Sequence, residues 1–216
     1  MTAASHDLPP ESGPILSPQD RKQRLGQQAK AIWLYGLSGA GKSTLAASLA
    51  HRLEREGFIT QVLDGDDIRA GMNRDLGFSD ADRTENIRRV AEVSKLFVQA
   101  GIIVINAFIT PTRAQRELAR EIVGRGDFVE VYVEASWETC TRRDAKGLYA
   151  KASLGQVGQF TGRDSPFEPP ERADLVISTD RETVGQSLER LYAFVVPRLR
   201  PRIESSPPCS GARTES

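Results

Sequence analysis

The chain alternates short apolar runs with stretches in which apolar residues recur every three or four positions. The runs are rich in β-branched and aromatic residues and lack polar alternation, which is typical of strands buried on both faces of a sheet. Their alternation with helical patterns predicts parallel strands, and hence a doubly wound α/β sandwich with its ligand crevice at the carboxyl ends of the strands. The expected strands are residues 31–35, 59–63, 102–106, 128–133 and 175–177.

The sequence GLSGAGKST lies between the first expected strand and a helical pattern of leucines. It matches G-x-x-x-x-G-K-[ST], a phosphate-binding loop, and the two flanking elements disfavour a chance glycine-rich turn. Its glycines let main-chain N–H groups approach phosphate oxygens, and the next helix directs its positive end there. We expect Lys42 at the β- and γ-phosphates and Ser43 on magnesium. The predicted nucleotide-binding residues are Gly36, Leu37, Ser38, Gly39, Ala40, Gly41, Lys42, Ser43 and Thr44.

The sequence DGDDIR follows the second expected strand and places acids and an arginine beside this loop. One carboxylate, of Asp64 or Asp66, can accept the proton of an attacking hydroxyl, and the other can hold magnesium. Arg69 suits an anionic substrate group because its guanidinium is a planar fork of donors. Alternatively, Asp64 or Asp66 caps a helix and Arg69 is solvated.

A further helix is predicted to start at Ser79, with Asp82 in a capping-box arrangement. Arg83 and Asn86 then lie near its first turn, where both can reach a substrate at the strand ends. Periodicity alone favours solvated positions for these two side chains and a core position for Phe78.

Residues 142–149 are strongly basic and precede several glycines, a pattern suited to a mobile lid. Closure of such a lid brings cations onto a transferred phosphoryl group and excludes water. An ordinary solvated loop fits the same pattern.

Composition narrows the class of protein. The 216 residues, 39% of them hydrophobic, suffice for one core. Lys plus Arg and Asp plus Glu both number 29, so the zero formal charge argues against nucleic acid or an anionic membrane as partner. The longest apolar stretch, residues 101–109, is too short to span a bilayer, and two cysteines without a disulfide framework fit a reducing cytoplasm. Proline-rich polar composition predicts flexible tails at 1–28 and 201–216 around a domain at 29–200.

Five segments resemble, in order and spacing, the adenylylsulfate kinase (APS kinase) family: GLSGAGKST, LDGDDIRAGMNRDLGFSDADRTENIRRVAEV, NAFITP, RRDAKGLYAKA and QFTGRDSPFEPP. The resemblance implies a three-layer P-loop kinase sandwich with a mainly parallel five-stranded sheet and a mobile lid at about residues 143–168. It also implies transfer of the γ-phosphoryl group of ATP, with Mg²⁺, to the 3′-hydroxyl of adenosine 5′-phosphosulfate (APS), which yields 3′-phosphoadenosine 5′-phosphosulfate for sulfate assimilation. Family members are often homodimers, so a homodimer is expected.

The resemblance assigns roles to single residues. Arg69, Arg83 and Asn86 are expected to hold the phosphosulfate and ribose. The other implied substrate contacts are Asp66, the adenine sandwich of Phe78 and Phe160, the loop residues Ile109 and Thr110, and the lid residues Lys146 and Leu148.

The expected catalytic residues are Lys42, Asp64, Asp66 and Thr110. The two aspartates share the base and magnesium functions. Asp64 is favoured as the base, and Ser43 and Asp66 are the expected magnesium ligands. Arg143 is expected to bind ATP.

Two positions depart from the family pattern, which usually reads DGDN and FISP where this chain has Asp67 and Thr110. Asp67 adds negative charge near an anionic substrate unless its side chain points outward. The serine of FISP has been proposed as a phosphorylated intermediate, and threonine keeps the hydroxyl but adds a stiff β-branch. We favour direct in-line transfer, because phosphoryl transfer mainly needs positioning and charge neutralisation.

Three other functions stay open: another small-metabolite kinase on this fold, a nucleotide-dependent switch or binding module, and a regulatory relic. No N-K-x-D guanine signature follows a late strand, and the third expected strand ends at Asn106 and not at a Walker-B acid. Intact Lys42, Ser43, Asp64 and Asp66 argue against a relic.

Overall fold

The computed structural model describes residues 16–144, 147, 149–150, 161 and 165–201. Its centre is a five-stranded parallel sheet in the order β2-β3-β1-β4-β5, which confirms the predicted α/β class. β3 runs beyond its predicted end because Phe108 pairs with Tyr35 of β1. The strands are β1 (Ala31–Tyr35), β2 (Thr60–Asp64), β3 (Ile103–Phe108), β4 (Phe128–Glu134) and β5 (Leu175–Ser178).

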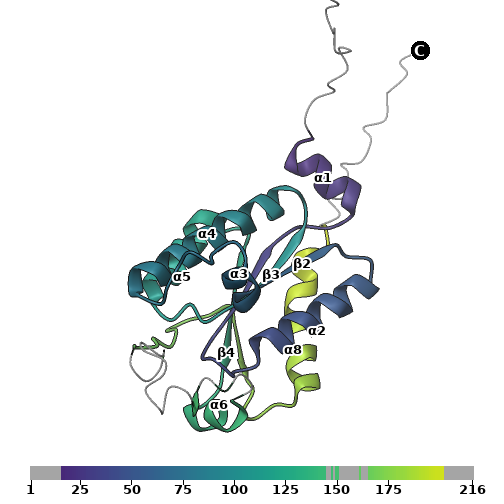
Figure 1. Cartoon of the computed structure of the whole chain (residues 1–216). Coiled ribbons are helices and arrows are strands. Elements are labelled where there is room, and N and C mark those ends of the chain that lie inside the picture. Colours follow the sequence, from purple (N-terminus) through teal and green to yellow (C-terminus); the bar gives the residue numbers. More distant parts are fainter. Residues whose placement is uncertain (1–15, 145–146, 148, 151–160, 162–164, 202–216) are drawn as a thin grey trace, which may run out of the picture.

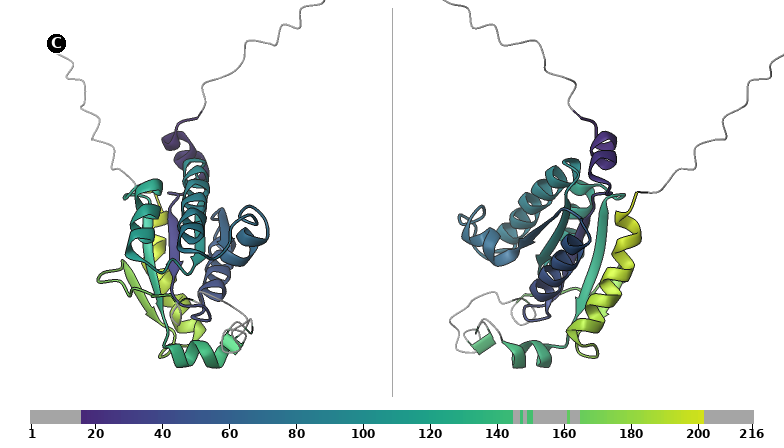
Figure 2. Two further views of the ribbon diagram at one scale, coloured as in Figure 1. Left: turned by 60° about the vertical axis from the view of Figure 1, so that its left-hand side comes forward. Right: turned by 90° about the vertical axis from the view of Figure 1, so that its right-hand side faces the viewer.

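Helices cover both faces of the sheet (Figures 1 and 2). The helices α2 (Lys42–Arg55) and α8 (Val184–Leu199) lie on one face, and α4 (Asp80–Gln99) and α5 (Arg113–Val123) lie on the other. Along β1, Ile32 and Leu34 enter the core under α2 and α8, whereas Trp33 and Tyr35 enter the core under α4 and α5. Both faces of the sheet are therefore apolar, which explains the continuous apolar runs in the sequence.

Local sequence signals set the starts of the helices that follow the strands. Gly41, with φ 99°, precedes α2 directly. Asp64 caps the short helix α3 (Gly65–Ala70) and Ser136 caps α6 (Trp137–Arg143). Ser79 is confirmed as the cap of α4, where its hydroxyl accepts from the main-chain N–H of Asp82. The starts of α2, α3 and α6 all follow carboxyl ends of strands, so they gather at one edge of the sheet.

The range 1–28, predicted as a tail, contains a helix that packs on the domain. The helix α1 (Pro18–Leu25) begins with a capping box at Ser17 and proline in its first turn. Arg21 donates to the carbonyl of Gln99 at 2.7 Å. Gln27, 1% exposed, donates to the carbonyls of Ile59 and Gly101, just before β2 and β3. The composition of residues 1–28 did not predict this helix, because the helix is stabilised by its caps and its hydrogen bonds to the domain and not by apolar content.

Several predictions concern residues outside the described ranges. These are residues 1–15 and 202–216 of the predicted tails, and Lys146, Leu148 and Phe160 of the predicted lid. The lid therefore stays a prediction. Within the described ranges, no helix combines the length and the apolar character that crossing a membrane requires.

Candidate active site

A cavity of about 720 Å³ opens at the carboxyl edge of the sheet. It lies where the strand order changes direction around β1, the usual ligand crevice of open α/β sheets. Most predicted site residues line it, namely Ser38, Gly39, Gly41, Lys42, Ser43, Thr44, Asp64, Asp66, Arg69, Phe78, Arg83, Asn86, Ile109, Thr110 and Arg143. Residues from five separate segments of the sequence thus meet in one place.

The phosphate-binding loop has the backbone that its glycines predict. Gly36, Gly39 and Gly41 have φ values of 152°, 78° and 99°. A Cβ on Gly36 would lie 2.2 Å from the carbonyl oxygen of Val133, so the loop can pass β4 only with glycine at this position. Gly36, Leu37 and Ala40 belong to the loop but do not line the cavity.

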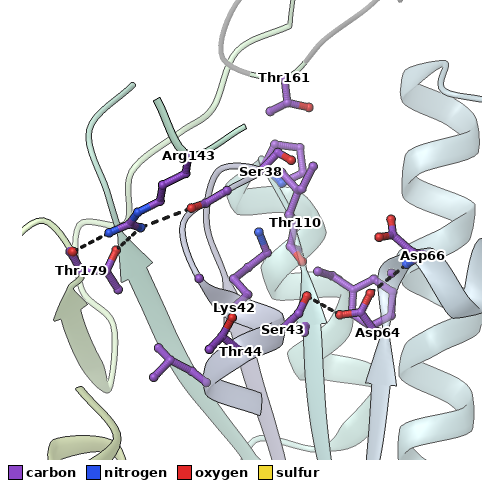
Figure 3. Close-up of a pocket in the computed structure, with 18 of the residues that line it drawn as sticks. Ser38, Lys42, Ser43, Thr44, Asp64, Asp66, Thr110, Arg143, Thr161 and Thr179 are labelled. Atoms are coloured by element: carbon purple, nitrogen blue, oxygen red, sulfur yellow. Dashed lines mark hydrogen bonds between the residues drawn. The ribbon is translucent and has the colours of Figure 1, made fainter. Parts of the chain in front are cut away.

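Lys42 lies at the centre of this loop. Its side chain is largely buried, and its ammonium group donates to the carbonyls of Gly36 and Leu37 at 3.0 and 2.7 Å. Figure 3 shows the side chain between the loop and Thr110. The positive charge is thus held at the start of α2, where main-chain N–H groups also attract an anion.

Asp64 links the second strand to the phosphate-binding loop (Figure 3). Its Oδ2 accepts from the hydroxyl of Ser43 at 2.5 Å, and its Oδ1 accepts from the main-chain N–H of Asp66 at 3.0 Å. The capping role that the sequence left open is therefore real, but Asp64 also contacts Ser43. Hydroxyl and carboxylate oxygens side by side suit a hard cation such as Mg²⁺.

Asp66 lines the cavity from the first turn of α3, with an exposed side chain. Asp67 is exposed too, but it does not line the cavity. The extra carboxylate at this departure from the family pattern therefore points away from the space for an anionic substrate.

Arg69 and Arg83 approach the cavity on the α3–α4 side. Arg69 donates to the carbonyl of Gly77 at 2.8 Å, and its guanidinium lies 4.5 Å from the centre of the Phe78 ring. Arg83 donates to the carbonyl of Phe78 at 2.9 Å and to the hydroxyl of Thr161 at 2.6 Å. Burial lowers the pKa of both arginines, and the charge of Arg83 lowers that of Arg69 further. Two half-buried cations in one cavity favour an anionic ligand between them.

Phe78 differs from the core position that periodicity favours. The residue is 57% exposed, and its ring lies at the cavity under the guanidinium of Arg69. An exposed aromatic ring beside a guanidinium offers a stacking surface for a planar base.

Thr110 occupies a strained turn after β3. Its φ is 41°, which is unusual for a β-branched residue, and the residue is 1% exposed. Its hydroxyl accepts from the indole N–H of Trp33 at 2.9 Å, and its carbonyl accepts from Arg116 at 3.3 Å. The hydroxyl is therefore engaged by Trp33 in a residue that is almost fully buried, an arrangement that suits a positioning role better than a phosphoryl carrier.

The side chain of Arg143 lies between the phosphate-binding loop and Thr179 (Figure 3). It donates to the hydroxyl and the carbonyl of Thr179 at 3.0 and 2.8 Å, and to the carbonyl of Gly39 at 3.3 Å. Tyr149, which follows in the chain, donates from its hydroxyl to the carbonyl of Ser38 at 2.8 Å. Arg143, the last residue of α6, and Tyr149 thus both bond to the loop that would hold a nucleotide.

The cavity has further lining residues that were not predicted as site residues. Thr179 and Glu182 lie in the turn after β5, whose composition is that of an ordinary loop, and Val184 and Ser187 lie at the start of α8. The remaining unpredicted lining residues are Leu45, Gly65, Ile87, Ala107, Phe108, Pro111, Gln115, Asp144, Tyr149 and Thr161. The expectation that ligands bind beyond the strand ends could have pointed to Gly65, Pro111 and Thr179, which follow β2, β3 and β5.

Comparison with known proteins agrees with this geometry. The family model described as adenylylsulphate kinase matches residues 28–178. The adenylyl-sulfate kinase of Bacteroides thetaiotaomicron is 48% identical over 185 residues, which cover 86% of this chain and 92% of that protein.

Solved structures agree as well. The APS kinase of Mycobacterium tuberculosis in complex with AMPPNP and APS is similar, with a TM-score of 0.75, 40% identity and coverage of 78% of this chain and 98% of that one. A hexameric APS kinase from Thiobacillus denitrificans has a TM-score of 0.60 at 26% identity, and the match covers 83% of this chain and 32% of that one. On this evidence the chain belongs to the adenylylsulphate kinase family.

Proposed function

We propose that this protein transfers the γ-phosphoryl group of ATP to the 3′-hydroxyl of adenosine 5′-phosphosulfate. One observation carries the proposal: a single cavity joins a phosphate-binding loop on one side to two arginines and an asparagine on the other. The first side suits a triphosphate and the second suits an anionic nucleotide. Family membership supplies the identity of both nucleotides.

On the ATP side, the main-chain N–H groups of the loop and the ammonium group of Lys42 bind the β- and γ-phosphates. Arg143 and Thr179 lie at the outer end of this side. On the acceptor side, Arg69, Arg83 and Asn86 bind the phosphosulfate and ribose, and Phe78 stacks on the adenine. Ile109 and Thr110 form the floor of the acceptor side.

The surroundings of the two aspartates favour a division of roles opposite to the one expected from sequence. Both oxygens of Asp64 accept hydrogen bonds, one of them from Ser43. Asp64 therefore suits the magnesium side, and Asp66 becomes the better candidate for the base that accepts the 3′-hydroxyl proton.

Ser43 and Asp64 would hold Mg²⁺ together with phosphate and water oxygens. Within the described residues no three acids, histidines or cysteines cluster as a complete metal site, which fits an ion that also needs the phosphates of its nucleotide. When bound, Mg²⁺ neutralises charge on the β- and γ-phosphates. Thr110 then positions the acceptor, and the phosphoryl group passes directly to the 3′-hydroxyl.

The test is turnover by the purified protein with ATP, magnesium and adenosine 5′-phosphosulfate, read by formation of the 3′-phosphorylated product. Lys42→Ala should lower kcat/KM by at least about a hundredfold, because the positive charge that stabilises the transferred phosphoryl group is lost. A substrate screen with AMP and simple sugars separates this activity from that of another small-metabolite kinase. Preferred turnover of a sugar would contradict the proposal.

Four further expectations complete the proposal. Residues 29–200 form the kinase domain, and the segment at about residues 143–168 acts as its lid. The protein works in the cytoplasm, and it forms a homodimer. The buried free thiol of Cys140 is compatible with a reducing compartment. Light scattering of the purified protein tests the dimer. A hexamer, as named for the Thiobacillus relative, is the alternative outcome.

A further inference from the structure

The loop between α3 and α4, residues 71–79, is organised around one fully buried polar side chain, that of Asn73. The main-chain N–H of Asn73 donates to the carbonyl of Ile68 at 2.9 Å, and its carbonyl accepts from Leu76 at 3.1 Å. Asn73 itself does not line the cavity. Any influence of Asn73 on a ligand must therefore pass through a neighbour.

That neighbour is Asn86, in the second turn of α4. The side-chain nitrogen of Asn73 donates to Oδ1 of Asn86 at 2.9 Å, and this hydrogen bond is buried. Asn86 is 4% exposed and lines the cavity. A side-chain amide has an oxygen that only accepts and a nitrogen that only donates. Since Asn73 engages the oxygen, the nitrogen is the polar group that Asn86 can direct to a ligand.

The same loop holds the two arginines of the acceptor side. The carbonyl of Gly77 accepts from Arg69, and the carbonyl of Phe78 accepts from Arg83. With Asn86 oriented by Asn73, all three side chains present donors. A wall of donors matches the oxygen-rich phosphosulfate and ribose, which mainly accept hydrogen bonds.

We propose that Asn73 is a positioning residue, which fixes the amide of Asn86 so that its nitrogen donates to an oxygen of the sulfated nucleotide. The inference rests on the proposed function. Without Asn73, the amide of Asn86 can turn over, and its oxygen would then face the oxygens of the substrate.

The test begins with Asn73→Leu, which has similar volume and no hydrogen-bonding group. KM for adenosine 5′-phosphosulfate should rise about tenfold, the effect of weakening one hydrogen bond to a charged group. KM for ATP should change less than about twofold. Asn73→Ser replaces the leucine variant if that variant does not fold. Its hydroxyl is too short to replace the amide, so it too should raise the KM for adenosine 5′-phosphosulfate and leave the KM for ATP nearly unchanged.

A double-mutant cycle distinguishes positioning from loop damage. If Asn73 acts through Asn86, then Asn73→Leu should add no further increase in KM to the variant Asn86→Leu. A further increase of tenfold would mean that the substitution disturbs Arg69 and Arg83 as well, and would overturn the proposal. An unchanged KM in Asn73→Leu would overturn it too.

Asn106→Leu is the matched control, because Asn106 is also fully buried but lies outside the cavity lining and accepts from Ser94 at 3.0 Å. It should leave the ratio of the two KM values unchanged. Wild-type turnover is measured first, so that failure of the proposed function, with no product from any protein, is distinct from failure of this inference.

Discussion

Side chains two residues apart can have different chemistry because their neighbours differ. Asp64 and Asp66 are equivalent in the sequence, where either can serve as cap, base or metal ligand. In the fold both aspartates line the cavity, but it is Asp64 that accepts a hydrogen bond from the hydroxyl of Ser43. The position of Ser43, twenty-one residues earlier in the chain, and the helix-cap bond of Asp64 distinguish the two side chains.

The different surroundings of Asp64 and Asp66 predict that their substitution affects different kinetic quantities. Asp66→Asn should lower kcat by about 10²–10⁴, because a general base is lost, with little change in KM for ATP. Asp64→Asn should mainly raise the magnesium concentration that gives half-maximal activity, since a charged ligand becomes neutral. Initial rates over a magnesium titration measure both effects.

Asp67→Asn is the matched control, since this carboxylate is exposed outside the cavity and its loss should leave both quantities unchanged. The reverse pattern, with kcat lost at saturating magnesium in Asp64→Asn and retained in Asp66→Asn, would restore Asp64 as the base.

At the scale of elements, the phosphate-binding loop follows closely from its sequence. Its glycines adopt the positive φ values that the motif requires, and α2 begins directly after them. The reason is local, because conformation here depends on residues within the motif. The contact of Gly36 with the backbone of Val133 is the exception, since it depends on the neighbouring strand.

Gly36→Ala should destabilise the protein by about 3 kcal/mol and abolish ATP binding, because the added methyl group would overlap the carbonyl of Val133. Gly57→Ala is the control: its φ is 87° and no atom lies within 4 Å of the added group. It should cost about 1 kcal/mol of backbone strain and leave ATP affinity unchanged. Thermal melting and calorimetric titration with ATP measure both. Equal ATP affinity in the two variants would contradict the steric argument.

At the scale of the whole molecule, the carboxyl and amino edges of the sheet differ in what they contribute. The carboxyl edge forms the cavity, and the amino edge is covered by α1 and the residues after it (Figure 1). Gln27 joins the starts of β2 and β3 through both groups of its amide, since its oxygen also accepts from the N–H of Ile59. The amino edge therefore contributes to stability without touching the site.

Gln27→Leu should lower the free energy of unfolding by about 2 kcal/mol, because buried main-chain groups lose their partner. The melting temperature should fall by roughly 4–8 °C. The KM values for both nucleotides should not change. Gln28→Leu is the control, since Gln28 contributes through its main-chain N–H, which donates to the carbonyl of Leu199. Calorimetry and steady-state kinetics on both variants test this division, and a changed KM in Gln27→Leu would refute it.

The sequence alone determined the layered parallel sheet and the nucleotide loop, because these depend on short-range patterns: apolar runs, glycine spacing and helix caps. The predicted acceptor-side residues came from the resemblance to the adenylylsulfate kinase family and not from such patterns. Tertiary structure decided the rest. Pairing of Asp64 with Ser43, of Asn73 with Asn86 and of Trp33 with Thr110 joins residues far apart in the chain. A hydrogen bond depends on the separation and direction of two groups in space, and no local pattern encodes either for residues that only the fold brings together.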